Sequence, residues 1–300
     1  MERRKVIRQG KGTLTMSLPM KWVKQLNLSS GDELEIEQRG FQLIIGPGKK
    51  QVRKKTEIDL RGYSKGLVFV IMNNLYIRGD EEIKFYFDRP ETYTAIADGV
   101  KHLLGFEIVE QTENSCVLKE LAAGESEDFE AILRRIFLIL LGMAEDGIEA
   151  LKTGKKDVIS MIQNRDQSIN TLVSYCLRML NRRGGSDIQK AMHLYTLLNF
   201  LEQLGDEYSR LYRDVSKVKQ TTISLMQKTA ALLRNFYELF YKFDKAKASS
   251  IKDARDKIRE ELNKNLPNIQ SRNDLIALHH LRSISDLIID IEKFNIAMQL

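Results

Sequence analysis

The sequence predicts a multidomain α+β protein with a β-rich N-terminal module, a small α/β domain and a long all-α region. Short apolar runs broken by glycines fill the first 46 residues. Strand and helix patterns then alternate, and from residue 125 onward apolar residues recur at three- and four-residue steps. We therefore place the domains at residues 1–48, 56–121 and 125–300.

The N-terminal module is expected to contain short strands and one short helix. The expected strands cover 6–7, 14–18, 34–37 and 41–45, the first turn covers 10–12, and the helix covers 21–26. Pro19 ends the second strand, and 46–48 closes the module. A unit of this size is too small to hold a comfortably stable core alone, so we expect it to dimerise or to dock on another surface.

The middle region should form a small α/β domain. Its expected strands are 56–60 and 82–87, and its expected helices are 65–77 and 90–104, with Pro90 near the first helical position. Residues 106–110 and 115–119 should pair as a hairpin across 112–114.

The remaining residues should form six helices with wide apolar stripes. The stripes cover 129–151, 158–180, 188–212, 218–243, 251–262 and 275–294, with breaks at 154–156, 181–186, 248–250 and 266–273. Asp157, Ser186 and Asn273 are the expected N-caps. The helices fall into two sets of similar length, about 127–213 and 215–299, which indicates duplication of a three-helix unit.

Positive charge is concentrated at the N-terminus. Residues 1–56 hold 13 lysines and arginines against 5 acidic residues, a net charge of +8, whereas the other 244 residues have a net charge of −2. A compact basic module on a nearly neutral body favours a polyanionic partner. The alternative is that these charges only solubilise the surface.

Several classes of protein find no support in the sequence. The chain starts with charged residues, and apolar runs such as 137–141 are far too short to span a bilayer, so we expect a cytoplasmic protein without membrane insertion. Cys116 and Cys176 make neither a metal spacing nor a disulfide framework. No phosphate-binding loop or nucleophile motif is present, and we expect no enzymatic activity and no catalytic residue. The neighbouring His279 and His280 are expected on the helix surface.

The N-terminal module resembles the SpoVT/AbrB family. The resemblance lies in 4–8, in the segment Gly12 to Pro19 that ends in Leu-Pro, in the short helical segment 22–26 and in 31–34 with its Gly-Asp pair. It implies a swapped-hairpin β-barrel that forms a homodimer and binds DNA. Thr15 and Val23 depart from the family, which carries basic residues at these places.

DNA binding of this kind needs basic side chains on one face, because phosphate contacts provide most of the affinity. The candidate DNA-binding residues are Arg3, Arg4, Lys5, Arg8, Lys11, Lys21 and Lys24. In a twofold dimer, two copies of this set would converge on one surface. Trp22 is expected in the core or the dimer interface. The alternative is a module that only dimerises or binds a protein.

The helical region resembles PhoU, a family tied to phosphate uptake. The resemblance rests on Leu201-Glu202-Gln203-Leu204-Gly205-Asp206 and on the duplicated three-helix layout. Together, the two resemblances match an archaeal-type architecture, an AbrB-like domain fused to a PhoU-like domain, whose members are regulators of phosphate uptake.

The PhoU resemblance also implies a divalent or iron-type metal bound by an acidic-x-x-x-Asp motif in each repeat. In the first repeat the motif is Glu202 and Asp206, which share one helix face. In the second repeat, Arg282 takes the place of the glutamate, and Asp286 and Asp290 form an acidic pair shifted by one turn. The candidate metal ligands are therefore Glu202, Asp206, Asp286 and Asp290, with solvated helix charges as the alternative.

These patterns lead to one main hypothesis and two alternatives. The main hypothesis is a dimeric, DNA-binding transcriptional regulator of phosphate homeostasis, whose helical domain senses a partner or a metal. The first alternative is an adaptor that contacts a phosphate transporter or a signalling protein and uses its N-terminal module only to dimerise. The second is storage of metal or phosphate.

Overall fold

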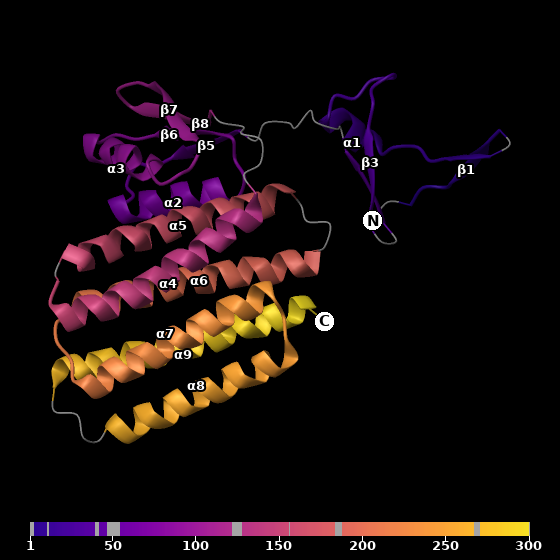
Figure 1. The fold of residues 1–300 in the computed structure, drawn as a ribbon. Coiled ribbons are helices and arrows are strands. Elements are labelled where there is room, and N and C mark those ends of the chain that lie inside the picture. The colour runs from indigo at the N-terminus through magenta and orange to yellow at the C-terminus, as the bar shows by residue number, and fades with distance from the viewer. Residues whose placement is uncertain are drawn as a thin grey trace. The chain divides into compact units, whose positions relative to one another are not determined.

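The computed structural model describes residues 3–10, 12–39, 42–46, 55–121, 128–155, 157–183, 188–266 and 271–299. The chain forms two compact units, Met1–Lys54 and Lys55–Leu300. In the described residues, short strand pairs dominate the first unit and helices dominate the second (Figure 1). The mixed α+β fold predicted from the sequence is thus confirmed.

The first unit contains two separate strand pairs and one short helix. Strand β1 (Ile7–Gln9) pairs antiparallel with β2 (Thr13–Thr15), and β3 (Glu35–Arg39) pairs antiparallel with β4 (Gln42–Gly46). Helix α1 (Met20–Gln25) starts directly after Pro19, one residue before the predicted start. The described residues of one chain do not close into a barrel. A swapped-hairpin barrel needs strands from a second copy, so that part of the prediction concerns the dimer.

The second unit begins with a four-stranded sheet in the order β5-β6-β8-β7. Strands β5 (Lys55–Asp59) and β6 (Glu82–Tyr86) run parallel, with helix α2 (Lys65–Ile77) as the crossover. Helix α3 (Pro90–Val100) leads to the predicted antiparallel hairpin of β7 (Phe106–Gln111) and β8 (Ser115–Glu120). Helix α3 ends four residues before the predicted end, because the bond from the Leu103 N–H to the Val100 carbonyl tightens the chain into a turn.

One face of this sheet carries the small core of the α/β domain. The register places Ile83 opposite Leu118 and Phe85 opposite Cys116 on that face, where they pack with side chains of α2 and α3. The alternate positions on the strands carry charged side chains such as Glu57. The alternation of apolar and charged residues along the strands therefore identifies the sheet face that the helices cover.

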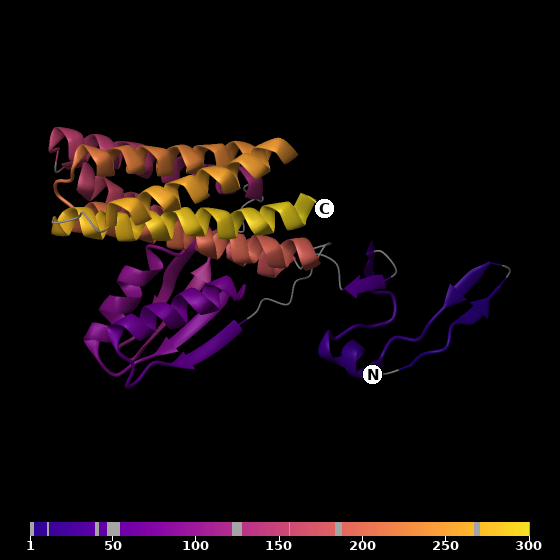
Figure 2. The same cartoon turned by 90° about the horizontal axis from the view of Figure 1, so that it is seen from below.

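Six long helices make up the rest of the described chain. They are α4 (Phe129–Thr153), α5 (Asp157–Arg183), α6 (Ile188–Asp214), α7 (Gln220–Tyr241), α8 (Lys245–Asn265) and α9 (Arg272–Gln299). They lie alongside one another in a bundle, and the α/β domain lies on one side of it (Figure 2), with α2 against α5. The expected two consecutive sets of three helices are present.

The boundary between α7 and α8 differs from the sequence prediction. The predicted break at 248–250 lies inside α8, which begins at Lys245. The Asp244 carboxylate caps the helix by accepting a hydrogen bond from the Lys247 N–H at 2.8 Å. Because this cap sits before the small residues, the alanines and serines that suggested a break continue the first turns of the helix.

The predicted N-caps of two other helices also need correction. Asn273 is the second residue of α9, and Ser271 precedes the helix, with its hydroxyl 3.4 Å from the Asp274 N–H. Asp157 is the first residue of α5, not the residue before it. Ser186 lies outside the described residues. Helix boundaries predicted from apolar stripes were therefore displaced by one or two residues at these ends.

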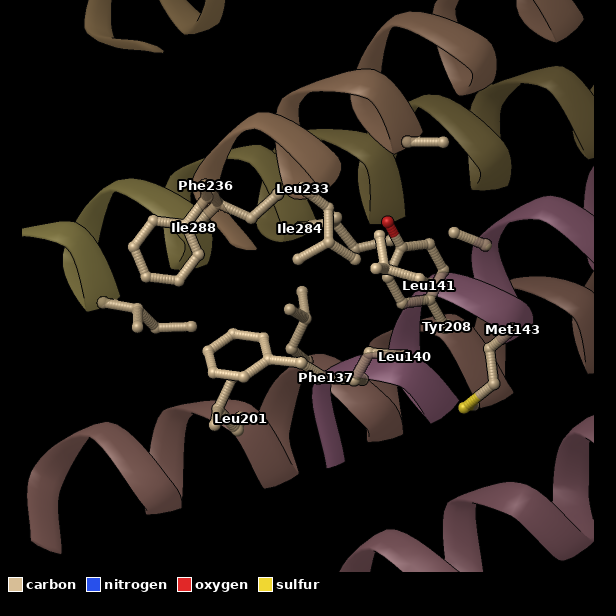
Figure 3. Close-up of a cluster of buried hydrophobic side chains, with 14 of the residues drawn as sticks. Phe137, Leu140, Leu141, Met143, Leu201, Tyr208, Leu233, Phe236, Ile284 and Ile288 are labelled. Carbon is tan, nitrogen blue, oxygen red and sulfur yellow. The ribbon is translucent and has the colours of Figure 1, made fainter. Parts of the chain in front are cut away.

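Side chains from several helices converge in the bundle core. Figure 3 shows Phe137 of α4 beside Phe236 of α7, and their ring centroids are 5.9 Å apart. Helices α4 and α6 pack closely at Gly147, where an added Cβ would lie 2.2 Å from the Tyr212 ring. The hydroxyl of Tyr212 also donates to the Ala144 carbonyl at 2.9 Å. None of the described helices is both long and apolar enough to cross a membrane.

Candidate functional site

The N-terminal unit has no core of its own in a single chain. None of the side chains that the structure describes in this unit is buried. Apolar side chains on all four strands remain largely in solvent: Ile7 is 63% exposed, Leu14 67%, Ile36 63% and Leu43 65%. A folded unit cannot gain stability from apolar side chains that stay in water.

The second strand pair, β3 and β4, carries the exposed Ile36 and Leu43 on one face. The register places Ile36 opposite Ile45 and Gln38 opposite Leu43. Directly opposed residues in an antiparallel pair point to the same side, so three of these four positions make an apolar face. In the described residues, nothing covers Ile36 and Leu43 on this face, which therefore needs another surface to pack against.

The candidate DNA-binding residues are all in solvent where they are described. Arg3, Arg4, Lys5, Arg8, Lys21 and Lys24 are exposed, whereas Lys11 lies outside the described residues. They fall into two groups, one along the segment that enters and forms β1 and the other on α1. Trp22, expected in a core or interface, is only half-buried in the single chain.

The two positions that depart from the AbrB pattern contribute to local structure. The Thr15 hydroxyl donates to the Ile7 carbonyl at 3.2 Å and so links β2 to β1. Val23 is half-buried in α1. Neither side chain carries a positive charge, so any charged contact to phosphate must come from the neighbouring lysines and arginines.

Glu202 and Asp206 lie on α6 and face a third carboxylate, that of Asp166 on α5. Burial raises the pKa of Glu202, and the charges of Asp206 and Asp166 raise it further. Burial also raises the pKa of Asp166, followed by the effect of the Asp206 charge. Within the described residues, Asp166 Oδ1 is buried without a hydrogen-bond partner. The structure thus brings together the two predicted acids and one more.

Asp206 is also part of a polar network between α6 and α9. Arg210 donates to Asp206 at 2.5 Å and to Glu207 at 3.0 Å, and Glu207 lies 2.8 Å from Nδ1 of His280. The expectation of a helix-surface position for His280 is wrong, since the side chain is buried. It is buried because Glu207 supplies a partner across the helix–helix contact.

A buried arginine on α5 joins the bundle to the α/β domain. Nη1 of Arg178 donates to the carbonyls of Tyr76 at 2.6 Å and Asp80 at 2.8 Å, and Nη2 donates to Glu120 at 3.1 Å. Its guanidinium lies 4.8 Å from the ring centre of Tyr76 and 4.9 Å from that of Phe106. A cation at the last carbonyls of a helix also interacts favourably with the helix dipole, here that of α2.

Two neighbours on α5 extend this contact, which we call the Arg178 clamp, comprising Arg178, Asn181 and Arg182. Arg182 donates to Glu120 at 2.7 Å and to Glu81 at 3.0 Å, and Asn181 donates to the Ile77 carbonyl at 2.8 Å. The clamp therefore joins the α/β domain to the bundle through hydrogen bonds from three side chains of α5.

Two family models match separate parts of the chain. The model described as "Antidote-toxin recognition MazE, bacterial antitoxin" matches residues 7–55, and the PhoU domain model matches residues 133–215. The chain combines a MazE/AbrB-like N-terminal domain with a PhoU domain. No curated protein is similar enough in sequence to count as a match.

Two solved structures are similar to the helical part. PhoU from Pseudomonas aeruginosa has a TM-score of 0.52 and 18% identity, and the similarity covers 57% of this chain and 95% of that protein. The phosphate transport system regulatory protein PhoU from Streptococcus pneumoniae has a TM-score of 0.48 and 17% identity, covering 57% and 93%. The match to the Pseudomonas aeruginosa protein shows the fold of the PhoU domain.

The acidic positions of the second PhoU repeat have different surroundings from those of the first. Arg255 on α8 lies 3.5 Å from Asp286, and Lys293 lies 2.5 Å from Asp290. These two carboxylates also face Lys252, beside Arg255, in a pocket of about 550 Å³. The predicted metal ligands of this repeat thus already form ion pairs with arginine and lysine side chains of the protein.

The facing helices differ in charge. Asp166 on α5 lies near Asp206, whereas Arg255 on α8 lies near Asp286. The aspartate of the motif thus meets an acid in the first repeat and an arginine in the second. Within the described part of the PhoU domain, no three Asp, Glu, His or Cys side chains adopt a metal-binding arrangement. A metal at Glu202 and Asp206 would require the side chains to move, and it stays a prediction.

Sequence reasoning missed the Arg178 clamp. Arg178 sits in the apolar segment Val173 to Leu180, where a charged residue interrupts a buried helix face. That interruption was the available signal, because arginine is almost never fully buried unless it is paired. Its partners, two backbone carbonyls and Glu120, cannot be read from spacing along the chain.

Proposed function

We propose that the protein is a dimeric DNA-binding transcriptional regulator of phosphate uptake and homeostasis, in which the PhoU domain senses a partner or a metal. The MazE/AbrB-like domain supports DNA binding, and the PhoU domain supports the link to phosphate uptake. The observation that carries the proposal is an N-terminal unit whose apolar and basic side chains are both exposed in one chain.

A second copy of the chain is the partner that best covers the apolar side chains. Pairing two units buries Ile36, Leu43 and their equivalents, at about 1.5 to 3 kcal/mol for each large side chain fully buried. Twofold symmetry also doubles the number of candidate phosphate contacts. One set of basic side chains would bind DNA weakly at physiological salt, whereas the two sets of a dimer bind it more tightly.

Sensing is assigned to the PhoU domain, where Asp166, Glu202 and Asp206 meet. Carboxylates that repel one another and are partly buried are hard ligands suited to a divalent or iron-type cation. Such an ion would relieve the repulsion and release Asp206 from Arg210. Elemental analysis of the full-length protein tests this, with about one metal per chain expected, reduced in Asp206→Asn. Substoichiometric metal in the wild type would contradict it.

DNA binding is tested with fragments of the genome that encodes the protein. The full-length protein should retain fragments upstream of phosphate-uptake genes, and a variant with Lys5→Glu, Arg8→Glu and Lys24→Glu should lose them while remaining dimeric. The matched control changes Lys152, Lys155 and Lys264 to glutamate, since these exposed lysines lie on the bundle. Equal retention by both triple variants would contradict a DNA-binding role for the module.

The adaptor function is the second candidate, and one observation favours it. Thr15 and Val23, where the AbrB family carries basic residues, have structural roles in this unit. An adaptor would dimerise through the module and contact a phosphate transporter or signalling protein without binding DNA. Retention of no fragment at low salt, together with normal phosphate regulation by the charge-reversed variant, would favour this candidate.

A further inference from the structure

A cavity of about 390 Å³ lies between the α/β domain and the PhoU domain. The α/β domain contributes Phe69, Asn73, Ile77 and His102, and helices α5 and α6 contribute the other lining residues. Cavities of this size at domain contacts are common places for small ligands. The Arg178 clamp holds the two walls together, so the cavity is present before any ligand arrives.

The lining offers several oxygens that can accept hydrogen bonds. Asn199 uses its Nδ2 to donate to the Tyr195 carbonyl at 2.7 Å, which leaves Oδ1 as an acceptor. Within the described residues, Asn170 Oδ1 is buried without a partner. The Thr171 hydroxyl donates to the Gln167 carbonyl at 3.1 Å and therefore can only accept from a ligand.

The charge of the lining disfavours anions. Glu202 supplies a carboxylate, and no lysine or arginine is among the described residues that line the cavity. An anion such as phosphate would meet a carboxylate and several carbonyl oxygens without a compensating cation, which is unfavourable in a partly closed site. A ligand with positive charge and N–H groups would satisfy the same atoms.

The aromatic residues on the other wall fit the same kind of ligand. Phe69 and His102 pack edge to face with ring centroids 6.2 Å apart, and His102 Nε2 lies 2.9 Å from Gln167 Nε2 across the domain contact. This contact links the α/β domain to α5 beside the aromatic pair. An aromatic face beside a carboxylate attracts organic cations through cation–π interaction.

We infer that this cavity binds a small organic cation with N–H donors, an amine or a guanidinium compound. Glu202 pairs with its charge, the oxygens of Asn170, Asn199 and Thr171 accept its N–H groups, and Phe69 covers its apolar part. Because the ligand touches both domains, its binding stabilises their contact. The inference is independent of DNA binding and goes beyond the proposed function.

Calorimetric titration of the full-length, metal-stripped protein tests the inference. The probes are agmatine and putrescine, with inorganic phosphate as the anion and tetramethylammonium as a cation without N–H donors. Saturable binding of agmatine or putrescine, and none of phosphate, is expected. Tetramethylammonium should bind at least tenfold more weakly than the better of the two amines. Failure of both amines to bind would overturn the inference.

Variants locate the binding within the cavity. Glu202→Gln and Asn199→Leu should each weaken binding of the better probe at least tenfold, since each removes one acceptor with little change of size. Glu149→Gln, the same change at an exposed position outside the lining, should leave binding unchanged. The melting temperature of each variant is first compared with that of the wild type. If Glu202→Gln is unstable, Asn199→Leu alone tests the assignment. Binding that survives both cavity variants would overturn the assignment.

A titration with Mn²⁺ separates this site from the metal proposal. Mn²⁺ binding that Asp206→Asn abolishes, with amine binding intact in that variant, would support two separate sites. The opposite result would be amine binding that is unchanged in Asn199→Leu but lost in Asp206→Asn. It would place the organic cation at the acidic cluster and overturn the cavity assignment.

Discussion

Replacing Arg178 with methionine removes the central side chain of the clamp while keeping much of its apolar volume. The change deletes two hydrogen bonds from a charged group to buried carbonyls and one to Glu120. Hydrogen bonds to charged groups contribute about 1.5 to 3 kcal/mol each. Glu120 keeps its bonds to Arg182, which limits the loss there. We expect a decrease of about 3 to 5 kcal/mol in the free energy of unfolding.

Differential scanning calorimetry of the full-length protein measures this effect. For a unit of this size, the expected loss corresponds to a decrease in melting temperature of about 10 °C. Arg182→Met is the matched comparison, because Arg182 is 27% exposed and its removal should cost only about 1 to 2 kcal/mol. A loss below about 1 kcal/mol for Arg178→Met, or a larger loss for Arg182→Met, would refute the reasoning.

Three further predictions concern packing, pH and assembly. Gly147→Ala should lower the free energy of unfolding by about 1 to 3 kcal/mol in urea denaturation, because the new Cβ would collide with Tyr212. Gly142→Ala is the control. Its Cβ would lie 3.4 Å from the flexible Arg165 side chain, so the change should be neutral or stabilise by up to about 1 kcal/mol. Burial raises the pKa of Glu292 from 4.5 to about 7, so the folded state binds the proton more tightly and stability should fall as pH rises from about 4.5 to about 7. Glu292→Gln should remove this dependence and stabilise by about 1 to 3 kcal/mol at pH 8 in melting curves, and an unchanged pH profile would contradict the shift. Leu43→Glu should convert the dimer to a monomer in sedimentation analysis, and an unaffected dimer would exclude this face as the interface.

Much of the fold could be predicted because apolar periodicity is local information. The stripes of the six helices and the alternation in strand β6 follow directly from which residues must avoid water. Helix ends were harder, as the start of α8 shows. Its cap depends on one carboxylate, Asp244, while the small residues that follow carry little preference.

The candidate sites were only partly predictable, since they depend on contacts between distant segments. Glu202 and Asp206 were found because they share one helix face, but the contribution of Asp166 depends on how α5 packs against α6. Likewise, nothing in the spacing of Asp286 indicates that Arg255 faces it. Tertiary packing determines whether an acidic pair meets further acids or a cation.

The salt dependence of DNA binding tests the central claim most directly. Fluorescence anisotropy of the full-length protein with a retained DNA fragment gives the dissociation constant between about 50 and 300 mM salt. Two converging sets of basic side chains predict a log–log slope between about −4 and −8, and a slope at least two units shallower for the variant with Lys5, Arg8 and Lys24 changed to glutamate. A slope shallower than about −2, or no binding at the lowest salt concentration, would contradict the account.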